Sequence, residues 1–253
     1  MVEVLALIPA RGGSKGIPRK NVLHVGGRPL IGYSIEHALC SRYITRTIVS
    51  TDDDEIAEVA QRFGAEVPFM RPVEYATDLA TDLQVFRHAL QALAQQDYRP
   101  ELVVHLRPTD PVREIAVLDD AIERMLATPE ADCLKSVSLT KLTPYKMWQI
   151  KGSELKPFAE LPAIPEAHSM PRQLLPPVYQ GIGYVDILRP RTVLELNSMC
   201  GRRILPFVID DHTLDLDYPE QLFEVEQALL RQRLQRRAPD TEASVKEATG
   251  TEG

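Results

Sequence analysis

The 253-residue sequence predicts an α/β fold in which helices flank a mostly parallel β-sheet. Short apolar runs, typical of buried strands, alternate along the first half of the chain with longer segments in which apolar residues recur at helical spacing. This alternation favours parallel strands connected by helices that cover both faces of the sheet. A glycine-rich and cation-rich segment follows the first apolar run, where ligands collect in open sheets of this kind.

The first half of the chain contains three predicted strands, and each is preceded or followed by a predicted helix. The strands are the apolar runs 4–10, 47–51 and 102–106. Pro29 suits the first turn of a helix over 29–40, and Gly64 closes a helix over about 56–63. Apolar spacing predicts two further helices, over 83–94 and 115–126.

The second half is less regular. Residues 141–177 hold seven prolines, which predicts turns and extended structure; these are residues 144, 157, 162, 165, 171, 176 and 177. Two return strands are expected at 183–188 and 204–209, and a terminal helix runs from Pro219 to about Leu234 with one apolar face. The tail, 236–253, is rich in Glu, Ala, Thr and Gly and is expected to be disordered.

Composition and charge restrict the class of protein. Hydrophobic residues make up 44% and charged residues 26%, which are ordinary values for a globular chain of one elaborated domain. The net charge of -7 argues against a nucleic-acid-binding surface. Cys40, Cys133 and Cys200 lack metal-ligand spacing and indicate reduced, structural thiols. The opening residues have too short an apolar stretch for a secretory signal, and no run is long enough to span a membrane, so we expect a cytoplasmic protein.

The segment from Ile8 to Asn21 carries the strongest chemical signal. Its glycines, Gly12 and Gly13, with Ser14 beside them, allow backbone N–H groups to approach phosphate oxygens, and its four cationic side chains can neutralise a triphosphate; these are Arg11, Lys15, Arg19 and Lys20. The spacing fits neither the dinucleotide-binding glycine pattern nor a P-loop. A nucleotide site is therefore indicated, with a solvated basic turn as the alternative.

Asp215 and Asp217 follow the last predicted strand as an Asp-Leu-Asp sequence. Alternate residues of an extended segment point to the same side, so the two carboxylates can converge on one cation. Mg²⁺ prefers a few carboxylates together with substrate phosphates. The alternative is a helix N-cap and a surface acid ahead of the terminal helix.

The chain resembles the CMP-sialic acid synthetases (N-acylneuraminate cytidylyltransferases), which are related to the CMP-Kdo synthetases. The resemblance covers about residues 3–230 and rests on motifs in the same order as in the family; these are Ile8 to Asn21, Ile48 to Asp52, Arg71-Pro72 with Ala76 to Thr81, Leu106 to Arg113, Pro171 to Pro176, and Asp215-Leu216-Asp217. It implies a Rossmann-like sheet of the nucleotide-diphospho-sugar transferase type, with a nucleotidyltransferase domain over 1–235. It also implies that residues 139–178 form a dimerisation and substrate insertion, and hence a homodimer.

The resemblance further implies an activity and a set of site residues. The reaction is transfer of CMP from CTP to a sugar-acid hydroxyl with release of pyrophosphate. Arg11 and Lys15 are expected at the triphosphate with Lys20 and Asn21 beside them, and Ala10, Arg11 and Thr81 at the pyrimidine. Asp215 and Asp217 are expected to hold Mg²⁺ and to be catalytic together with Arg11 and Lys15. Arg107, Lys146, Arg172 and Tyr179 are expected at the acid; no general base is identified.

Three positions depart from the family pattern in its substrate half. Arg107 stands where Gln is usual, Asp110 where Ser is usual, and Ile182 where Asn is typical. A guanidinium in place of an amide suits a second anionic group or a different sugar tail, whereas pairing between Arg107 and Asp110 would leave the substrate unchanged. Alternatives are a Kdo-like, pseudaminic, legionaminic or non-sugar acid, a different nucleotide, or a binding module without catalysis.

Overall fold

The computed structural model describes residues 2–210 and 214–248, with 236–248 described by their backbone alone. The chain divides into two compact units. The first consists of Met1–Lys135, Gly183–Leu205 and Leu214–Gly253, and the second of Ser136–Ile182 and Pro206–Thr213. The second unit contains the whole segment 139–178 that the sequence analysis expects to be an insertion.

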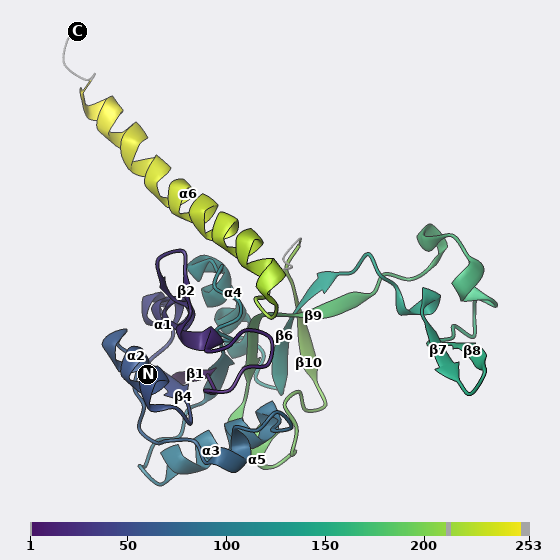
Figure 1. Ribbon diagram of the computed structural model, residues 1–253, viewed down its shortest axis with the longest axis horizontal. Helices are drawn as coiled ribbons and strands as arrows, with labels where there is room; N and C mark the ends of the chain where they lie inside the picture. The colour runs from purple at the N-terminus through teal and green to yellow at the C-terminus, as the bar shows by residue number, and fades with distance from the viewer. Residues whose placement is uncertain (1, 211–213, 249–253) are drawn as a thin grey trace. The chain divides into compact units, whose positions relative to one another are not determined.

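A six-stranded sheet has the order β10-β6-β9-β5-β1-β4 (Figure 1). Its strands are β1 (Val4–Pro9), β4 (Arg46–Ser50), β5 (Leu102–His105), β6 (Cys133–Leu139), β9 (Tyr179–Leu188) and β10 (Ile204–Val208). β1 lies between β4 and β5 and is parallel to both, with Leu7 opposite Ile48 and His105, while β9 is antiparallel to β5. The prediction of a mostly parallel sheet flanked by helices is confirmed.

The helices of the first unit are α1 (Leu30–Cys40), α2 (Asp54–Arg62), α3 (Asp82–Ala94), α4 (Ile115–Leu126), α5 (Pro190–Leu194) and α6 (Leu222–Ala248). Local capping signals mark the start of two of them. Asp53 caps α2 by accepting a hydrogen bond from the Ile56 N–H, and Thr81 and Gln84 form a capping box at α3. Gly64, at φ +94°, follows the end of α2.

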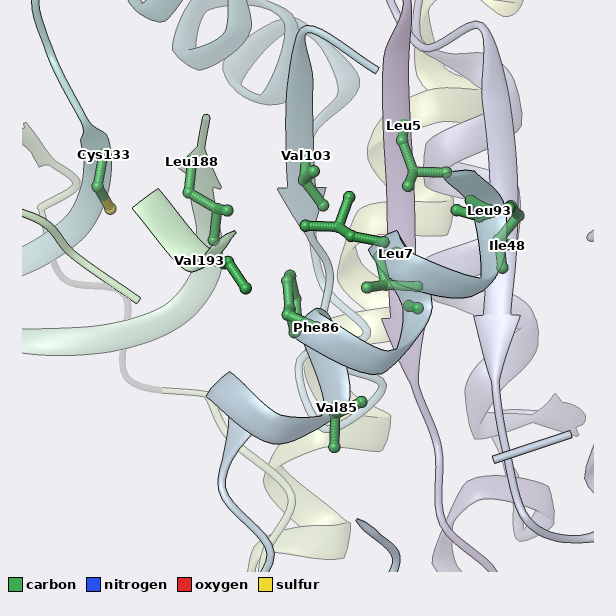
Figure 2. Packing of buried hydrophobic residues seen from close by; sticks show 12 residues of the cluster. Leu5, Leu7, Ile48, Val85, Phe86, Leu93, Val103, Cys133, Leu188 and Val193 are labelled. Carbon is green, nitrogen blue, oxygen red and sulfur yellow. The ribbon is translucent and has the colours of Figure 1, made fainter. Parts of the chain in front are cut away.

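Alternate residues of β1 contribute to a buried hydrophobic cluster on one face of the sheet (Figure 2). Leu5 and Leu7 are fully buried there against Phe86 of α3 and Val193 of α5. Each such buried side chain contributes about 1.5–3 kcal/mol to folding. Figure 1 shows α3 and α5 on this side of the strands and α1 and α4 on the other. Two packed faces thus fix the carboxyl ends of β1 and β5 in one place.

Short elements complete the two units. In the first, β2 (His24–Val25) and β3 (Arg28–Pro29) form a small hairpin, and 3-10 turns lie at Lys20–Val22, Val73–Tyr75 and Pro219–Gln221. In the second, β7 (Trp148–Lys151) and β8 (Glu154–Pro157) pair antiparallel, and 3-10 turns lie at Pro144–Lys146, Ala167–Ser169 and Arg172–Leu174. The hairpin of β7 and β8 was not predicted, although Gly152-Ser153 between two runs is a recognised hairpin signal.

The terminal helix is longer than expected. α6 continues to Ala248, whereas the sequence analysis expected disorder from residue 236; residues 249–253 lie outside the described residues. Residues 236–248 include three Ala, two Arg and two Glu, all of which favour helix. Among the described residues, no helix is both long and apolar enough to cross a membrane.

Candidate nucleotide site

A cavity of about 400 Å³ opens at the carboxyl ends of β1 and β5 in the first unit. Six of the residues that the sequence analysis assigned to a site lie along its wall: Arg11, Lys20, Asn21, Arg107, Asp215 and Asp217. These residues come from three segments that are far apart in the chain. The sheet therefore brings the glycine-rich loop, the motif after β5 and the Asp-Leu-Asp sequence to one place.

The glycine-rich loop is fixed at several points. The Asn21 side-chain amide donates to the Arg11 carbonyl oxygen (2.9 Å), and the Gly12 N–H donates to Asp52 Oδ1 (3.0 Å). At the end of the loop, Ile17 packs in a buried cluster together with Leu216. Gly13 is exposed and Ser14 is half-buried. Asn21 thus shapes the loop as well as lining the cavity.

Arg19 has a different partner from the one that the sequence analysis expected. Its guanidinium forms ion pairs with Asp53 (2.5 Å) and Glu55 at the start of α2. The hydrogen bond from Arg19 lowers the pKa of the Asp53 carboxyl, so this pair stays charged over a wide pH range. Arg19 therefore attaches the loop to α2, which leaves three of the four loop cations for a bound anion.

Arg11 and Lys15 share one carboxylate, that of Asp78. Arg11 Nη1 lies 2.9 Å from Asp78 Oδ1, and Lys15 Nζ lies 2.9 Å from Asp78 Oδ2. Both nitrogens belong to side chains that remain partly exposed. The two cations expected at a triphosphate thus converge on the same point, where an anionic group already lies.

Asp215 and Asp217 face the cavity on either side of a buried residue. Leu216 is fully buried, and its N–H donates to the Thr109 carbonyl oxygen (2.8 Å), which ties this segment to the loop after β5. Asp217 Oδ1 accepts from Lys20 Nζ (2.8 Å). The alternating pattern predicted from the sequence, with both carboxylates on one side, is what the structure contains.

The two carboxylates fit a magnesium ion. Asp215 Oδ1 is buried without a hydrogen-bond partner, and burial raises the pKa of this carboxyl, so a cation there would satisfy an otherwise costly group. Within the described part of the chain, no group of three or more His, Cys, Asp or Glu side chains could hold a metal. A cation would therefore rely on these two carboxylates and on ligand phosphates, as Mg²⁺ prefers.

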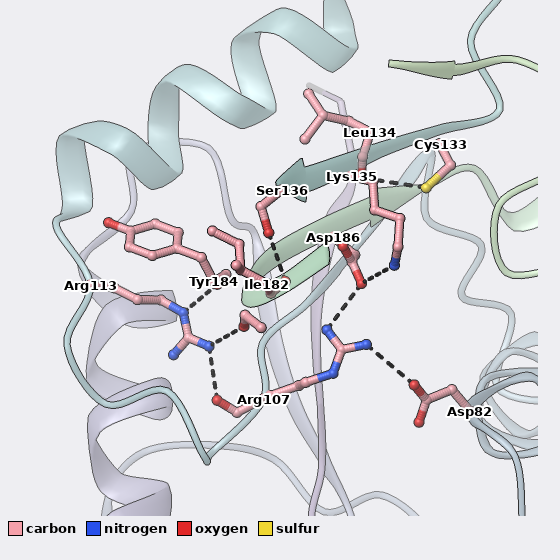
Figure 3. A network of polar contacts seen from close by, with 11 residues as sticks. Asp82, Arg107, Arg113, Cys133, Leu134, Lys135, Ser136, Ile182, Tyr184 and Asp186 are labelled. Carbon is pink, nitrogen blue, oxygen red and sulfur yellow. Dashed lines mark hydrogen bonds and ion pairs between the residues drawn. The ribbon is translucent and has the colours of Figure 1, made fainter. Parts of the chain in front are cut away.

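Arg107 lies between two carboxylates (Figure 3). Its Nη1 is 3.0 Å from Asp186 Oδ2 and its Nη2 is 3.3 Å from Asp82 Oδ2. Lys135 Nζ lies 3.1 Å from the same Asp186 oxygen. Burial alone would lower the pKa of Arg107, but the charges of Asp186 and Asp82 outweigh it and raise that pKa. The two ion pairs hold the Arg107 side chain in place at the wall of the cavity.

Arg113, the last residue of the motif after β5, is wholly buried and has a structural role. Its guanidinium donates to the carbonyl oxygens of Tyr184 (2.5 Å), Gly183 (3.1 Å) and Arg107 (2.8 Å), to that of Asp110, and to the Ser34 hydroxyl (3.0 Å). These bonds connect the loop after β5 with α1 and β9. Arg113 therefore fixes the backbone from which Arg107 projects.

Other residues of the cavity wall were not assigned to the site from the sequence, among them Arg71, Asp78 and His105. Arg71 is 5% exposed and burial lowers its pKa to about 10; it donates to the carbonyl oxygens of Ser50 and Tyr75. His105 is fully buried with both ring nitrogens unpartnered, and desolvation holds its pKa well below the usual value. Arg71 belongs to the Arg71-Pro72 motif, whereas nothing in the sequence separates His105 from an ordinary strand residue.

The remaining assigned residues do not line the cavity. Ala10 is buried and its N–H donates to the Ser50 carbonyl oxygen (3.0 Å); Thr81 is exposed and caps α3 between the lining residues Ala80 and Asp82. Lys146, Arg172 and Tyr179 lie in the second unit. There Lys146 Nζ donates to the His168 carbonyl oxygen (3.4 Å).

The fold and the cavity define a nucleotide-binding α/β protein, because a glycine-rich loop, cations and paired carboxylates meet at the ends of parallel strands. The cytidylyltransferase family model matches residues 5–147, and the chain belongs to this family.

Individual proteins that are similar to this chain are consistent with its assignment to the cytidylyltransferase family. A CMP-N,N'-diacetyllegionaminic acid synthase of Legionella pneumophila is 31% identical over 90% of this chain and 100% of its own length. A pseudaminic acid cytidylyltransferase of Campylobacter jejuni is 42% identical, but the match spans 48% of this chain and only 53% of the relative. The solved CMP:2-keto-3-deoxy-manno-octonic acid synthetase, in complex with CTP, has a TM-score of 0.69 at 15% identity over 91% of this chain and 99% of its own, which shows a shared fold.

Proposed function

We propose that this chain transfers CMP from CTP to a hydroxyl group of a sialic-acid-like sugar acid and releases pyrophosphate. One observation supports the proposal above the others: Arg11, Lys20, Asn21, Asp215 and Asp217 line a single cavity at the ends of the parallel strands. Cationic and acidic groups together suit a triphosphate that binds with a divalent cation. Relatives named for legionaminic and pseudaminic acids favour a nine-carbon acid as the acceptor.

In the proposed reaction, the acceptor oxygen attacks the α-phosphorus of CTP. A new oxygen–phosphorus bond forms, the bond between the α-phosphorus and its bridging oxygen to the β-phosphate breaks, and the hydroxyl proton passes to solvent. Arg11 and Lys15 bind the charge of the triphosphate, and Lys20 and Asn21 hold the loop beside it. These residues contribute by positioning and charge neutralisation, which supply most of the catalysis in phosphoryl transfer.

Asp215 and Asp217 are the residues that would hold Mg²⁺. When bound, the ion supplies charge neutralisation at the phosphates and orientation of the reacting groups. Lys20 keeps the Asp217 carboxylate aimed at the cavity, and the bond from Leu216 to Thr109 keeps Asp215 there.

The proposal extends to assembly and location. We propose a homodimer, supported by the many large apolar side chains that the second unit exposes, among them Trp148 (47%), Ile150 (78%) and Phe158 (62%). Arg107, Lys146, Arg172 and Tyr179 are proposed to contact the acid. A cytoplasmic location is proposed from the three free cysteines.

The test is pyrophosphate release with Mg²⁺ and each of CTP, ATP, GTP and UTP, against a panel of nine-carbon and eight-carbon sugar acids. CTP-specific release with one acid is expected and would name the acceptor. Release with a Kdo-like acid alone, or with another nucleotide, would favour the alternative substrates on the same fold. CTP that fails to bind would refute the proposal.

A further inference from the structure

Asp78 lies on the segment that joins the 3-10 turn Val73–Tyr75 to α3, and it lines the cavity. Each of its carboxylate oxygens contacts a different cation of the glycine-rich loop, Arg11 through Oδ1 and Lys15 through Oδ2, both at 2.9 Å. The Asp78 side chain is 43% exposed, and that of Lys15 is 76% exposed. Asp78 therefore joins the loop to the opposite wall of the cavity by contacts that water can reach.

The contacts of Asp78 coincide with those expected of a polyphosphate. A phosphate group presents oxygen acceptors to guanidinium and ammonium donors in much the same geometry as a carboxylate. Arg11 and Lys15 cannot direct the same N–H donors to Asp78 and to a phosphate at once. Ligand phosphates and Asp78 therefore compete for these two side chains.

We infer that Asp78 is a positioning residue that aligns Arg11 and Lys15; this inference rests on the function proposed above. Ligand phosphates displace Asp78 from the two cations, and its return speeds the release of pyrophosphate. Exposed ion pairs are individually weak, so a polyphosphate of high charge displaces the carboxylate readily. After transfer, the same carboxylate recaptures both cations as pyrophosphate leaves. The site thus binds CTP less tightly than its cations alone would allow, and it releases the product faster.

Other carboxylates of the cavity are engaged differently. Asp217 pairs with Lys20, and Asp82 pairs with Arg107 on another side of the cavity. The Lys15 hydrogen bond lowers the pKa of Asp78, which keeps the carboxylate ionised and able to compete at neutral pH. Asp78 is therefore the carboxylate whose removal should alter phosphate affinity through Arg11 and Lys15 together.

The test compares Asp78→Asn and Asp78→Glu with wild type, using calorimetric binding of pyrophosphate, CTP and CMP, together with steady-state kinetics. In Asp78→Asn we expect pyrophosphate and CTP to bind about fivefold more tightly, because two exposed ion pairs no longer compete. CMP affinity should change little. KM for CTP and kcat should fall together, product inhibition by pyrophosphate should strengthen, and Asp78→Glu should restore wild-type values.

A matched control removes an exposed ion pair elsewhere. Glu123→Gln breaks the surface pair with Arg42 (3.2 Å) on α4 and should alter none of these constants. Unchanged or weaker pyrophosphate binding in Asp78→Asn would refute the inference, as would a raised requirement for Mg²⁺, which would indicate a metal ligand. Wild-type protein that does not bind CTP would refute the proposed function instead, so the two failures are distinguishable.

Discussion

Arg113 donates a hydrogen bond from Nη2 to the backbone carbonyl oxygen of Arg107 at 2.8 Å. A fully buried guanidinium thereby fixes the position of a second guanidinium at the cavity wall. Because Arg113 also donates to the carbonyl oxygens of Gly183 and Tyr184, it joins the loop after β5 to this part of β9. Two arginines of one eight-residue motif, Leu106 to Arg113, thus have separate tasks, one structural and one at the cavity.

Arg113→Lys should destabilise the protein by about 3 kcal/mol, because an ammonium cannot reach this many acceptors and several buried carbonyl oxygens lose their partner. The free energy of unfolding from urea titration measures the effect. Arg191→Lys is a suitable control, since Arg191 is half exposed and forms a single ion pair with Asp132 (3.2 Å). Equal stability losses in the two variants would contradict the structural role of Arg113.

Gly16→Ala should disturb the glycine-rich loop. A Cβ at Gly16 would overlap the carbonyl oxygen of Asp217, so either the loop or the Asp-Leu-Asp segment must shift. We expect a lower Tm and a loss of turnover of at least about tenfold, because small displacements of phosphate-binding groups are costly. Gly13→Ala is the control for stability, because a Cβ at Gly13 would meet nothing within 4 Å. Its free energy of unfolding should lie within about 0.5 kcal/mol of the wild-type value. The same Tm for both variants would argue against the contact.

Asp217→Asn should lower turnover with Mg²⁺ by about 100-fold while leaving Tm nearly unchanged. The side chain is 53% exposed, so loss of its pair with Lys20 costs little stability. Turnover as a function of Mg²⁺ concentration is the measurement, and Glu220→Gln, an exposed acid nearby, is the control. Unaltered turnover would remove the metal role from this residue.

Because His105 is fully buried, we expect the protein to lose stability in mild acid. Desolvation, followed by the charges of Arg107, Lys135 and Arg113, holds its folded-state pKa well below the usual 6.5. The unfolded chain therefore binds more protons below about pH 6.5, and stability falls there by up to about 1.4 kcal/mol per pH unit. In His105→Leu the free energy of unfolding should depend less on pH in mild acid. At pH 8 the variant should be as stable as wild type, because the substitution removes two buried nitrogens that have no hydrogen-bond partner.

Urea unfolding at pH 8.0 and 5.5 measures that effect. His24→Gln, at an exposed position of β2, is the control and should lose as much stability in mild acid as wild type does. A His105→Leu variant with the full acid loss would place the responsible group elsewhere, for example at His88, whose pKa burial also lowers.

The longer helices and the three parallel strands of the first unit could be predicted because their signals are local, whereas α5, β6 and the hairpin of β2 and β3 were not predicted. The helix Ile115–Leu126 has the bounds that its apolar spacing predicts, and Asp215 and Asp217 line the same cavity, as the alternation of side chains in an extended segment predicts. The ion-pair partners of the loop arginines could not be predicted in the same way. That Arg19 binds α2 and Arg11 binds Asp78 depends on which segments the sheet brings together. The buried, unpartnered His105 likewise carries no sequence mark, because its strand neighbours are ordinary apolar residues.

Arg107→Gln bears on the choice of acid. In wild type the Arg107 guanidinium is held by Asp82 and Asp186 and retains further N–H donors for an acceptor at the cavity wall. In the variant, Asp186, whose side chain is 6% exposed, keeps its pair with Lys135 (3.1 Å), so folding should be preserved. We expect KM for the acid to rise about tenfold, the effect of losing one charge-assisted hydrogen bond, while KM for CTP stays the same. Equal losses for both substrates would mean that Arg107 shapes the whole cavity, and no loss for either would mean that its contacts with Asp82 and Asp186 are its only role.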